Sequence, residues 1–169
     1  KYHRHVLFAL PGASKTLIRD FDGDGLPDVM ALKVQGDEGV DIHFNQGNGR
    51  FKRKRILRFS PLFGSVSIRL HAVNMDGYED LLYVNGDNAD YSMIEKPYHG
   101  VRIFMNDGEN NFKEEYFFAL NGAYDAISAD FDQDGDAEQA RGLHHLLQQG
   151  EGLLGQLLVP GLGPESGGQ

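Results

Sequence analysis

The sequence predicts an all-β fold, a partial β-propeller of four-stranded antiparallel blades followed by a non-propeller tail. Three observations lead to this prediction. Short strand-like segments occur in groups of four, two motifs recur in the same order along the chain, and residues 1–136 contain no long segment with helical periodicity. Four short antiparallel strands in a repeat of about 50 residues are typical of a propeller blade.

An Asp-rich loop is the most regular of the repeated motifs. Its first copy has carboxylates at loop positions 1, 3, 5 and 9 and glycine at position 6, namely Asp20, Asp22, Asp24, Asp28 and Gly25. Side chains at alternate positions of a tight loop can turn toward one centre, and Ca²⁺ takes several oxygen ligands in flexible geometry. The loop therefore predicts a calcium site, in which Leu26 at position 7 contributes its backbone carbonyl. A solvated acidic turn, the alternative, does not require strict alternation with glycine.

Two further copies of this loop begin at residues 72 and 130. The second has Ala72 at position 1 and should bind calcium more weakly; its expected ligands are Asn74, Asp76, Tyr78 through its carbonyl, and Asp80. The third ends in Glu rather than Asp; its expected ligands are Asp130, Asp132, Asp134, Asp136 and Glu138. An EF-hand is excluded, because it needs flanking helices and a Glu at position 12, where the three loops have Ala31, Tyr83 and Arg141.

The strand-like segments divide the chain into successive units. The expected outer strand of a preceding blade covers 1–10, one blade covers 12–60, another covers 64–119, and a third begins at 122–136. Within the two full blades, strands are expected at 15–19, 29–34, 40–45 and 51–59, and at 65–71, 81–85, 101–106 and 112–118. Since a ring typically needs about four to eight blades, the chain is interpreted as part of a longer propeller.

The second repeated motif joins the third and fourth strands of each blade. Residues 44–51 and 105–112 match each other: both have Asn at the second position, contain an Asn/Gly-rich turn and end with Phe. Such a turn between two strand-like runs is a strong signal for a β-hairpin.

Two segments depart from the repeat. Residues 86–100 form a long excursion, and the weaker candidates for ligand binding lie in it or beside it: Tyr91, Tyr98, His99 and Arg102. Long loops on a rigid scaffold often bind ligands, although the insert could instead pack its aromatic side chains on a neighbouring blade. Residues 137–169 contain no aromatic residue and are rich in Gly, Leu and Gln, so we expect an irregular or partly helical, flexible tail.

Composition limits the classes of function. The net charge of −9 argues against a nucleic-acid partner, and no apolar run reaches the length of about 18 residues that a membrane span needs. The chain has no cysteine, so thiolate catalysis and thiolate metal sites are excluded. No serine lies in a Gly-x-Ser-x-Gly motif, and we expect a non-enzymatic protein.

The Asp loops at 20–28 and 130–135, together with the segment 106–112, resemble the FG-GAP/VCBS repeat family. This propeller class is found in integrin α-subunits and in many exported bacterial proteins. The resemblance covers about residues 1–136 and implies calcium in the loop between the first and second strands of a blade. It also implies an extracellular, periplasmic or cell-surface protein that binds a protein or glycan ligand or serves adhesion. The alternative is part of a calcium-dependent polysaccharide lyase or a carbohydrate-binding propeller.

Overall fold

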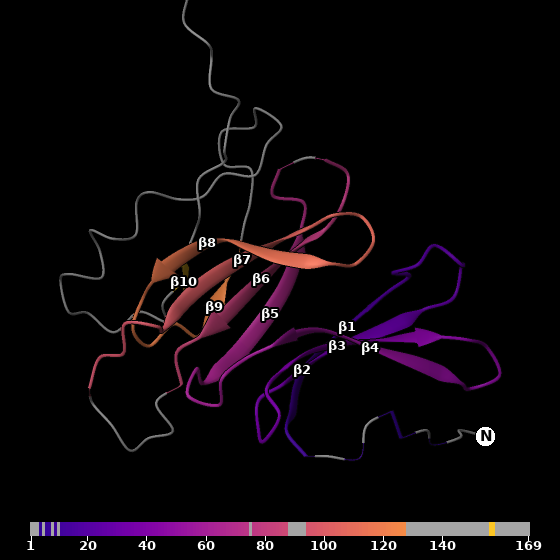
Figure 1. Ribbon diagram of the computed structural model, residues 1–169, viewed down its shortest axis with the longest axis horizontal. Helices are drawn as coiled ribbons and strands as arrows, with labels where there is room; N and C mark the ends of the chain where they lie inside the picture. Colours follow the sequence, from indigo (N-terminus) through magenta and orange to yellow (C-terminus); the bar gives the residue numbers. More distant parts are fainter. Residues whose placement is uncertain are drawn as a thin grey trace, which may run out of the picture.

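A computed structural model describes residues 4, 6, 7, 9, 11–74, 76–87, 94–127 and 156–157. This part of the chain is all-β: it contains two four-stranded antiparallel sheets and one short two-stranded sheet, and no helix (Figure 1). Among these residues no helix is long and apolar enough to cross a membrane.

The first sheet contains four strands in the order of the sequence. They are β1 (Ala13–Arg19), β2 (Asp28–Lys33), β3 (Gly39–Asn45) and β4 (Phe51–Arg58). Each strand pairs antiparallel with the next one along the chain. The four strands predicted for this stretch are confirmed to within two residues at either end.

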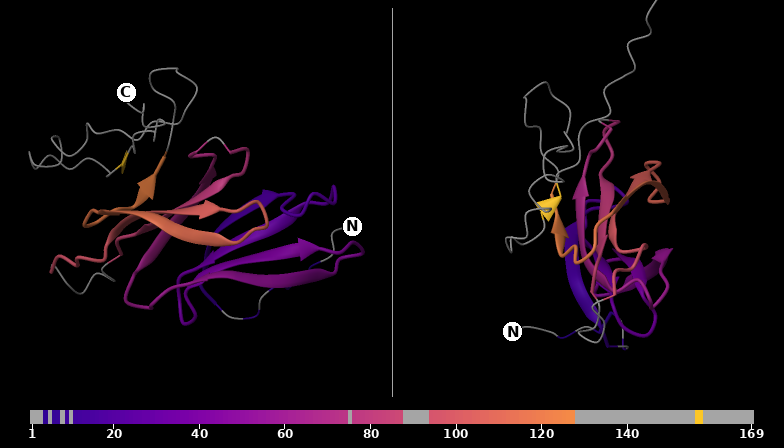
Figure 2. Two further views of the ribbon diagram at one scale, coloured as in Figure 1. Left: turned by 45° about the horizontal axis from the view of Figure 1, so that its top comes forward. Right: turned by 90° about the vertical axis from the view of Figure 1, so that its left-hand side faces the viewer.

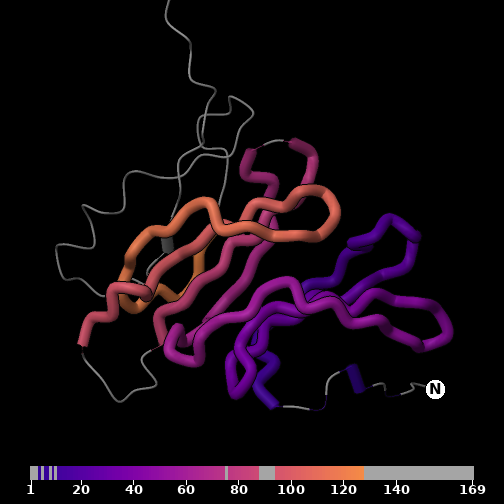
Figure 3. The backbone as a smooth tube through the Cα atoms, viewed as in Figure 1, coloured from indigo at the N-terminus to yellow at the C-terminus, as the bar shows by residue number. Residues whose placement is uncertain are grey.

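The second sheet repeats this arrangement. Its strands are β5 (Ser65–His71), β6 (Asp80–Asn85), β7 (Gly100–Asn106) and β8 (Phe112–Ala119), again in sequence order and antiparallel. Figures 2 and 3 show this sheet, magenta to orange, beside the indigo-to-purple first sheet. A short strand β9 (Asp125–Ala126) follows and pairs in parallel with β10 (Gln156–Leu157).

The hydrophobic core lies between the two sheets. Alternate residues of a strand point to opposite faces, so one face of β2 and β3 supplies Met30, Leu32, Val40 and Ile42. These side chains pack against buried residues of the second sheet and of the segment that leads into it, namely Phe59, Ile68, Leu81, Tyr83 and Phe104.

The other face of the second sheet is covered as well. Leu82, Val84, Val101 and Ile103 form a second apolar cluster with Val73, Ala123 and Ala126. Because both faces are covered, every residue of β6 is buried, which explains its continuous apolar run.

Glycine begins the third strand of each sheet for a steric reason. A Cβ atom on Gly39 would lie 2.2 Å from the carbonyl oxygen of Leu57, and one on Gly100 would lie 2.0 Å from that of Phe118. The φ angles of 153° and 157° also favour glycine. This close approach of backbone to backbone accounts for glycine at both positions.

Three of the predicted segments fall mostly or wholly outside the described residues. Of residues 1–10 only four are described, the expected third blade is described up to Ile127, and only the strand β10 is described in the tail. The limits predicted for these segments therefore stay predictions.

Candidate metal centre

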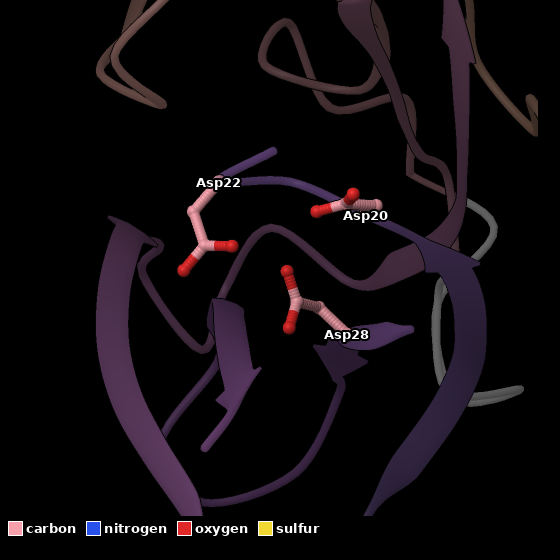
Figure 4. Close-up of side chains that lie close together, drawn as sticks. All are labelled: Asp20, Asp22 and Asp28. Atoms are coloured by element: carbon pink, nitrogen blue, oxygen red, sulfur yellow. The ribbon is translucent and has the colours of Figure 1, made fainter. Parts of the chain in front are cut away.

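The Asp loop, residues 20–28, connects β1 to β2 and gathers three carboxylates. Asp20, Asp22 and Asp28 each offer an oxygen atom, and these atoms lie within 4.8 Å of one another. The three side chains face a common centre (Figure 4). Asp20 and Asp22 are exposed and Asp28 is fully buried. Within the described ranges this is the one group of three acidic or histidine side chains that lie so close together.

Hydrogen bonds from the loop's own backbone hold its carboxylates in place. Asp20 accepts from the N–H groups of Gly23 and Gly25, each at 2.8 Å, one on each carboxylate oxygen. Asp24, which is not part of the group of three, accepts from the N–H of Leu26 at 2.8 Å. Gly23 and Gly25 have φ angles of 75° and 85°, a region that glycine adopts without strain.

Asp28 has a different role from the exposed carboxylates. Its Oδ2 accepts from the N–H of Phe21 at 2.9 Å, and its Oδ1 accepts from the N–H of Asn45 at 2.6 Å. The side-chain amide of Asn45 in turn donates to the carbonyl of Pro27 at 3.1 Å. Asp28 therefore ties the start of the Asp loop to the end of β3.

The same connection occurs in the second sheet. Asp80 accepts from the N–H groups of Val73 and Asn106, both at 2.9 Å, and the Asn106 amide donates to the carbonyl of Glu79 at 3.1 Å. Burial raises the pKa of the Asp80 carboxyl, although both backbone N–H groups oppose this shift. The Asp at loop position 9 and the Asn of the hairpin motif are therefore one structural unit. Their separation along the sequence, 17 residues in one sheet and 26 in the other, concealed this link.

Among the described residues of the second loop, no three acidic side chains lie as close together as in the first. Ala72 offers no carboxylate at position 1, and the amide of Asn74 donates to Asp76 at 2.9 Å. Asp76 also accepts from the N–H of Tyr78 at 2.9 Å. These side chains therefore engage one another and the local backbone. Five predicted ligands of the third loop lie outside the described residues and stay predictions: Asp130, Asp132, Asp134, Asp136 and Glu138.

The electrostatics of the Asp loop favour a cation at its centre. Desolvation, followed by the negative charge of Asp24, raises the pKa of the Asp22 carboxyl above its ordinary value, and Asp28 and Asp20 act in the same direction. Arg19, at the edge of the loop, pairs with Glu79 at 3.5 Å. A donor set made only of oxygen atoms suits a hard cation such as Ca²⁺ better than a thiophilic metal.

A turn of the second sheet lies against the Asp loop. Asn110, which is 8% exposed, donates from its side-chain amide to the carbonyl of Phe21 at 2.6 Å. The ammonium group of Lys54 in β4 donates to the carbonyls of Glu109 and Asn110, each at 3.1 Å. Asn110 is not among the predicted site residues, because nothing local in its hairpin indicates a contact with a residue 89 positions away.

Two of the described candidates for ligand binding, His99 and Arg102, are buried, and Tyr98 is half-buried. Arg102 is 5% exposed, donates to the carbonyl of Tyr98 at 3.0 Å and lies 4.1 Å from the centre of the Phe117 ring. His99 is 1% exposed, and burial lowers the pKa of its imidazole. Tyr91 lies outside the described residues. A ligand-binding role for these residues stays a prediction.

The comparison with protein families agrees with the motifs. Neither a curated protein nor a solved structure matches the chain. The family model of the FG-GAP-like repeat matches residues 20–83, from the Asp loop into β6. Such repeats are structural and ligand-binding modules rather than catalytic ones, and they occur mainly in extracellular proteins. Residues 20–83 thus match the FG-GAP-like repeat, which confirms the resemblance for the Asp loop at 20–28. The loop at 130–135 and the segment 106–112 lie outside the matched residues.

Proposed function

We propose that the chain is a calcium-binding β-propeller repeat module of an exported or cell-surface protein, and that it serves adhesion or ligand binding. The observation that carries the proposal is the convergence of Asp20, Asp22 and Asp28 in the loop of an FG-GAP-like repeat. Three carboxylates so close together repel one another in the absence of a cation.

Calcium would be held by the oxygen atoms of the loop. The ligands would be Asp20, Asp22, Asp24, the carbonyl of Leu26, and Asp28. The two oxygens of Asp28 already accept backbone N–H groups, but a carboxylate has about four lone-pair sites and can face a cation as well. The ion would neutralise the loop and fix the turn between β1 and β2, so that its binding free energy adds to the stability of the sheet.

The propeller architecture is supported by the repetition of the sheets. Two four-stranded antiparallel sheets follow each other along the chain and pack through a shared core, and the second sheet is covered on its far face by residues 123–126. In this proposal residues 12–60 and 64–119 are blades, a third blade begins at 122, and 137–169 lie outside the propeller. The second and third loops would be weaker calcium sites than the first.

Isothermal titration calorimetry with CaCl₂ tests the proposal. Extracellular calcium modules have dissociation constants of roughly 10⁻⁴ to 10⁻³ M, and we expect the chain to fall in this range. Asp22→Ala should weaken binding at least about tenfold, because it removes a charged ligand. Glu115→Gln, on the exposed side of β8, is the control and should leave binding unchanged. Absence of binding heat in the parent chain would refute the calcium site.

A glycan array and a panel of extracellular matrix proteins test the ligand-binding role. Binding that requires calcium and disappears with Asp22→Ala would support a scaffold stabilised by calcium. Formation of unsaturated sugars from polyuronates would favour the lyase alternative, although the described candidate residues His99 and Arg102 are buried.

A further inference from the structure

A second site lies between the two sheets, apart from the Asp loop. We propose that the cavity between β1 and β5 binds the oxyanion group of a small carboxylate- or sulfate-bearing molecule. The cavity has a volume of about 290 Å³ and is lined on its polar side by Lys15, Arg19, Arg69 and His71. This volume is just below the range of about 300–1,000 Å³ that is usual for small-molecule sites, so the bound molecule must be small.

Basic residues of β1 and β5 come together because alternate residues of a strand point to the same face of the sheet. β1 and β5 are the first strands of their sheets and contact each other. Lys15 and Arg19 lie on the same face of β1, and Arg69 and His71 lie on the same face of β5. Both pairs line the same cavity, which concentrates positive charge in a chain with a net charge of −9.

Neighbouring acids neutralise only part of this charge. Arg69 pairs with Asp125, and Arg19 pairs with Glu79 at 3.5 Å. Among the described residues the ammonium group of Lys15 has no hydrogen bond or ion pair, so these acids do not balance its charge.

Donor groups also remain available. Arg69 uses Nε and Nη2 on Asp125, and Arg19 uses Nη1 on the carbonyl of Ile18. A guanidinium group has five N–H donors and an ammonium group has three. An oxyanion can therefore accept hydrogen bonds from Lys15, Arg19 and Arg69 while the existing pairs stay intact.

The rest of the lining indicates an organic anion rather than a bare ion. Leu17, Leu70 and Ile127 supply apolar surface beside the cations. An acidic sugar or a similar small molecule has both an oxyanion and a carbon framework that can contact such a surface. Uronate carboxylates and sulfate groups share this recognition chemistry.

Titration of the ¹⁵N-labelled full chain, followed by NMR, tests the site. Sodium glucuronate and sodium sulfate are the anionic probes, and glucose at the same ionic strength and calcium concentration is the neutral control. We expect saturable shifts of the amide signals of residues 15–19 and 69–71 with at least one anion and none with glucose. Binding of glucuronate alone would identify a carboxylate site, and binding of both would identify a general oxyanion site.

Two variants make the test decisive. Lys15→Gln should weaken binding of the probe about tenfold, as expected for the loss of a charge-assisted contact, without changing the melting temperature. Lys113→Gln, an exposed change in β8, should leave the affinity unchanged. Arg19→Gln should weaken binding in the same way as Lys15→Gln. Absence of localised shifts with both anions, or full affinity in Lys15→Gln, would overturn the proposal.

Discussion

Asp22 and Asp28 belong to one motif but lie in different environments. Asp28 is fully buried and accepts two backbone N–H groups, one from its own loop and one from the end of β3. Asp22 is exposed and accepts one long hydrogen bond, from the N–H of Asp24 at 3.3 Å. The same residue type therefore accepts two backbone hydrogen bonds in the interior at one position and leaves its carboxylate largely exposed at the other.

Replacing Asp28 or Asp22 by alanine should separate these roles. In EDTA, Asp28→Ala should lower the free energy of unfolding by about 3 kcal/mol, because two partly buried N–H groups lose a charged acceptor. Asp22→Ala should change the free energy by less than about 0.5 kcal/mol in EDTA, as expected for an exposed position. Urea denaturation followed by circular dichroism measures both. Equal losses of stability would contradict the division of roles.

Gly39 tests the steric argument for glycine at the start of β3. Gly39→Ala should destabilise the chain by roughly 2–3 kcal/mol, because the added methyl group would lie 2.2 Å from the Leu57 carbonyl oxygen. Gly47→Asn is the matched control. Gly47 has a φ of 72°, a conformation that asparagine tolerates, and a Cβ atom added there would have no neighbour within 4 Å. A thermal melt in which Gly39→Ala and Gly47→Asn cost the same would disprove the steric account.

At the scale of elements, the Asp loop and the turn at 107–111 form one contact between the sheets. Asn110 completes it by donating to Phe21, and Lys54 holds the turn from the side of β4. The corresponding position of the first hairpin is Gly49, and both residues have positive φ. The side chain of Asn110 therefore serves the contact with Phe21, since the turn itself can be made with glycine.

Asn110→Gly removes this contact without straining the turn. We expect the free energy of unfolding in EDTA to fall by about 1–2 kcal/mol, since the Phe21 carbonyl loses its donor. Calcium affinity should fall several-fold, because Phe21 lies inside the Asp loop. Calorimetry and denaturation measure the two effects, and the control Glu109→Gln should change neither. An unchanged calcium affinity in Asn110→Gly would show that the contact between sheets is not coupled to the loop.

For the whole molecule, buried charge should govern stability in acid. Burial alone would raise the pKa of Asp41, but hydrogen bonds from Lys33 and Arg55 outweigh it and the pKa lies below its ordinary value. The hydrogen bond from Arg69 lowers the pKa of Asp125 in the same direction. In the second sheet the position equivalent to Asp41 is occupied by Arg102, whose Nε lies 3.3 Å from a carboxylate oxygen of Glu114. The buried side chain at this position is therefore a cation in the second sheet and an anion in the first.

The sign of the resulting pH dependence follows from these lowered pKa values. Each carboxylate contributes its full stabilisation above the unfolded pKa of about 3.9 and loses it as the pH falls through the lower folded pKa. Asp41→Asn should cost roughly 3 kcal/mol at pH 7, because it leaves buried cations without their partner, and should make the remaining stability less sensitive to acid. Denaturation at a series of pH values from neutral to acid checks both effects. A variant with the same acid sensitivity as the parent would contradict the assignment.

Much of the fold was predictable because its signals are local. Strand-like segments in groups of four, the two recurring motifs and the Asn/Gly-rich turns placed all eight strands of the two large sheets to within two residues. The pairing of β9 with β10 was not predictable, because it joins residues 31 positions apart through two-residue strands that carry no periodic pattern.

The candidate site was predictable in part for the same reason. Regular spacing within nine residues predicted four carboxylates, and three of them, Asp20, Asp22 and Asp28, lie together in the structure. Spacing alone could not show that Asp24 is not part of this group. The structural role of Asp28, its link to Asn45 and the contact from Asn110 all depend on residues distant in the sequence. Spacing alone also could not show that Asn74 and Asp76 hydrogen-bond to each other in the second loop.

Thermal unfolding with and without calcium tests the central claim most directly. If the Asp loop binds Ca²⁺ in the folded state only, saturating calcium at about 100 times the dissociation constant should add about 2.7 kcal/mol to the free energy of unfolding relative to EDTA. The melting temperature of the parent chain should then rise with calcium, whereas that of Asp22→Ala should rise far less. An identical melting temperature of the parent chain in calcium and in EDTA would contradict the account.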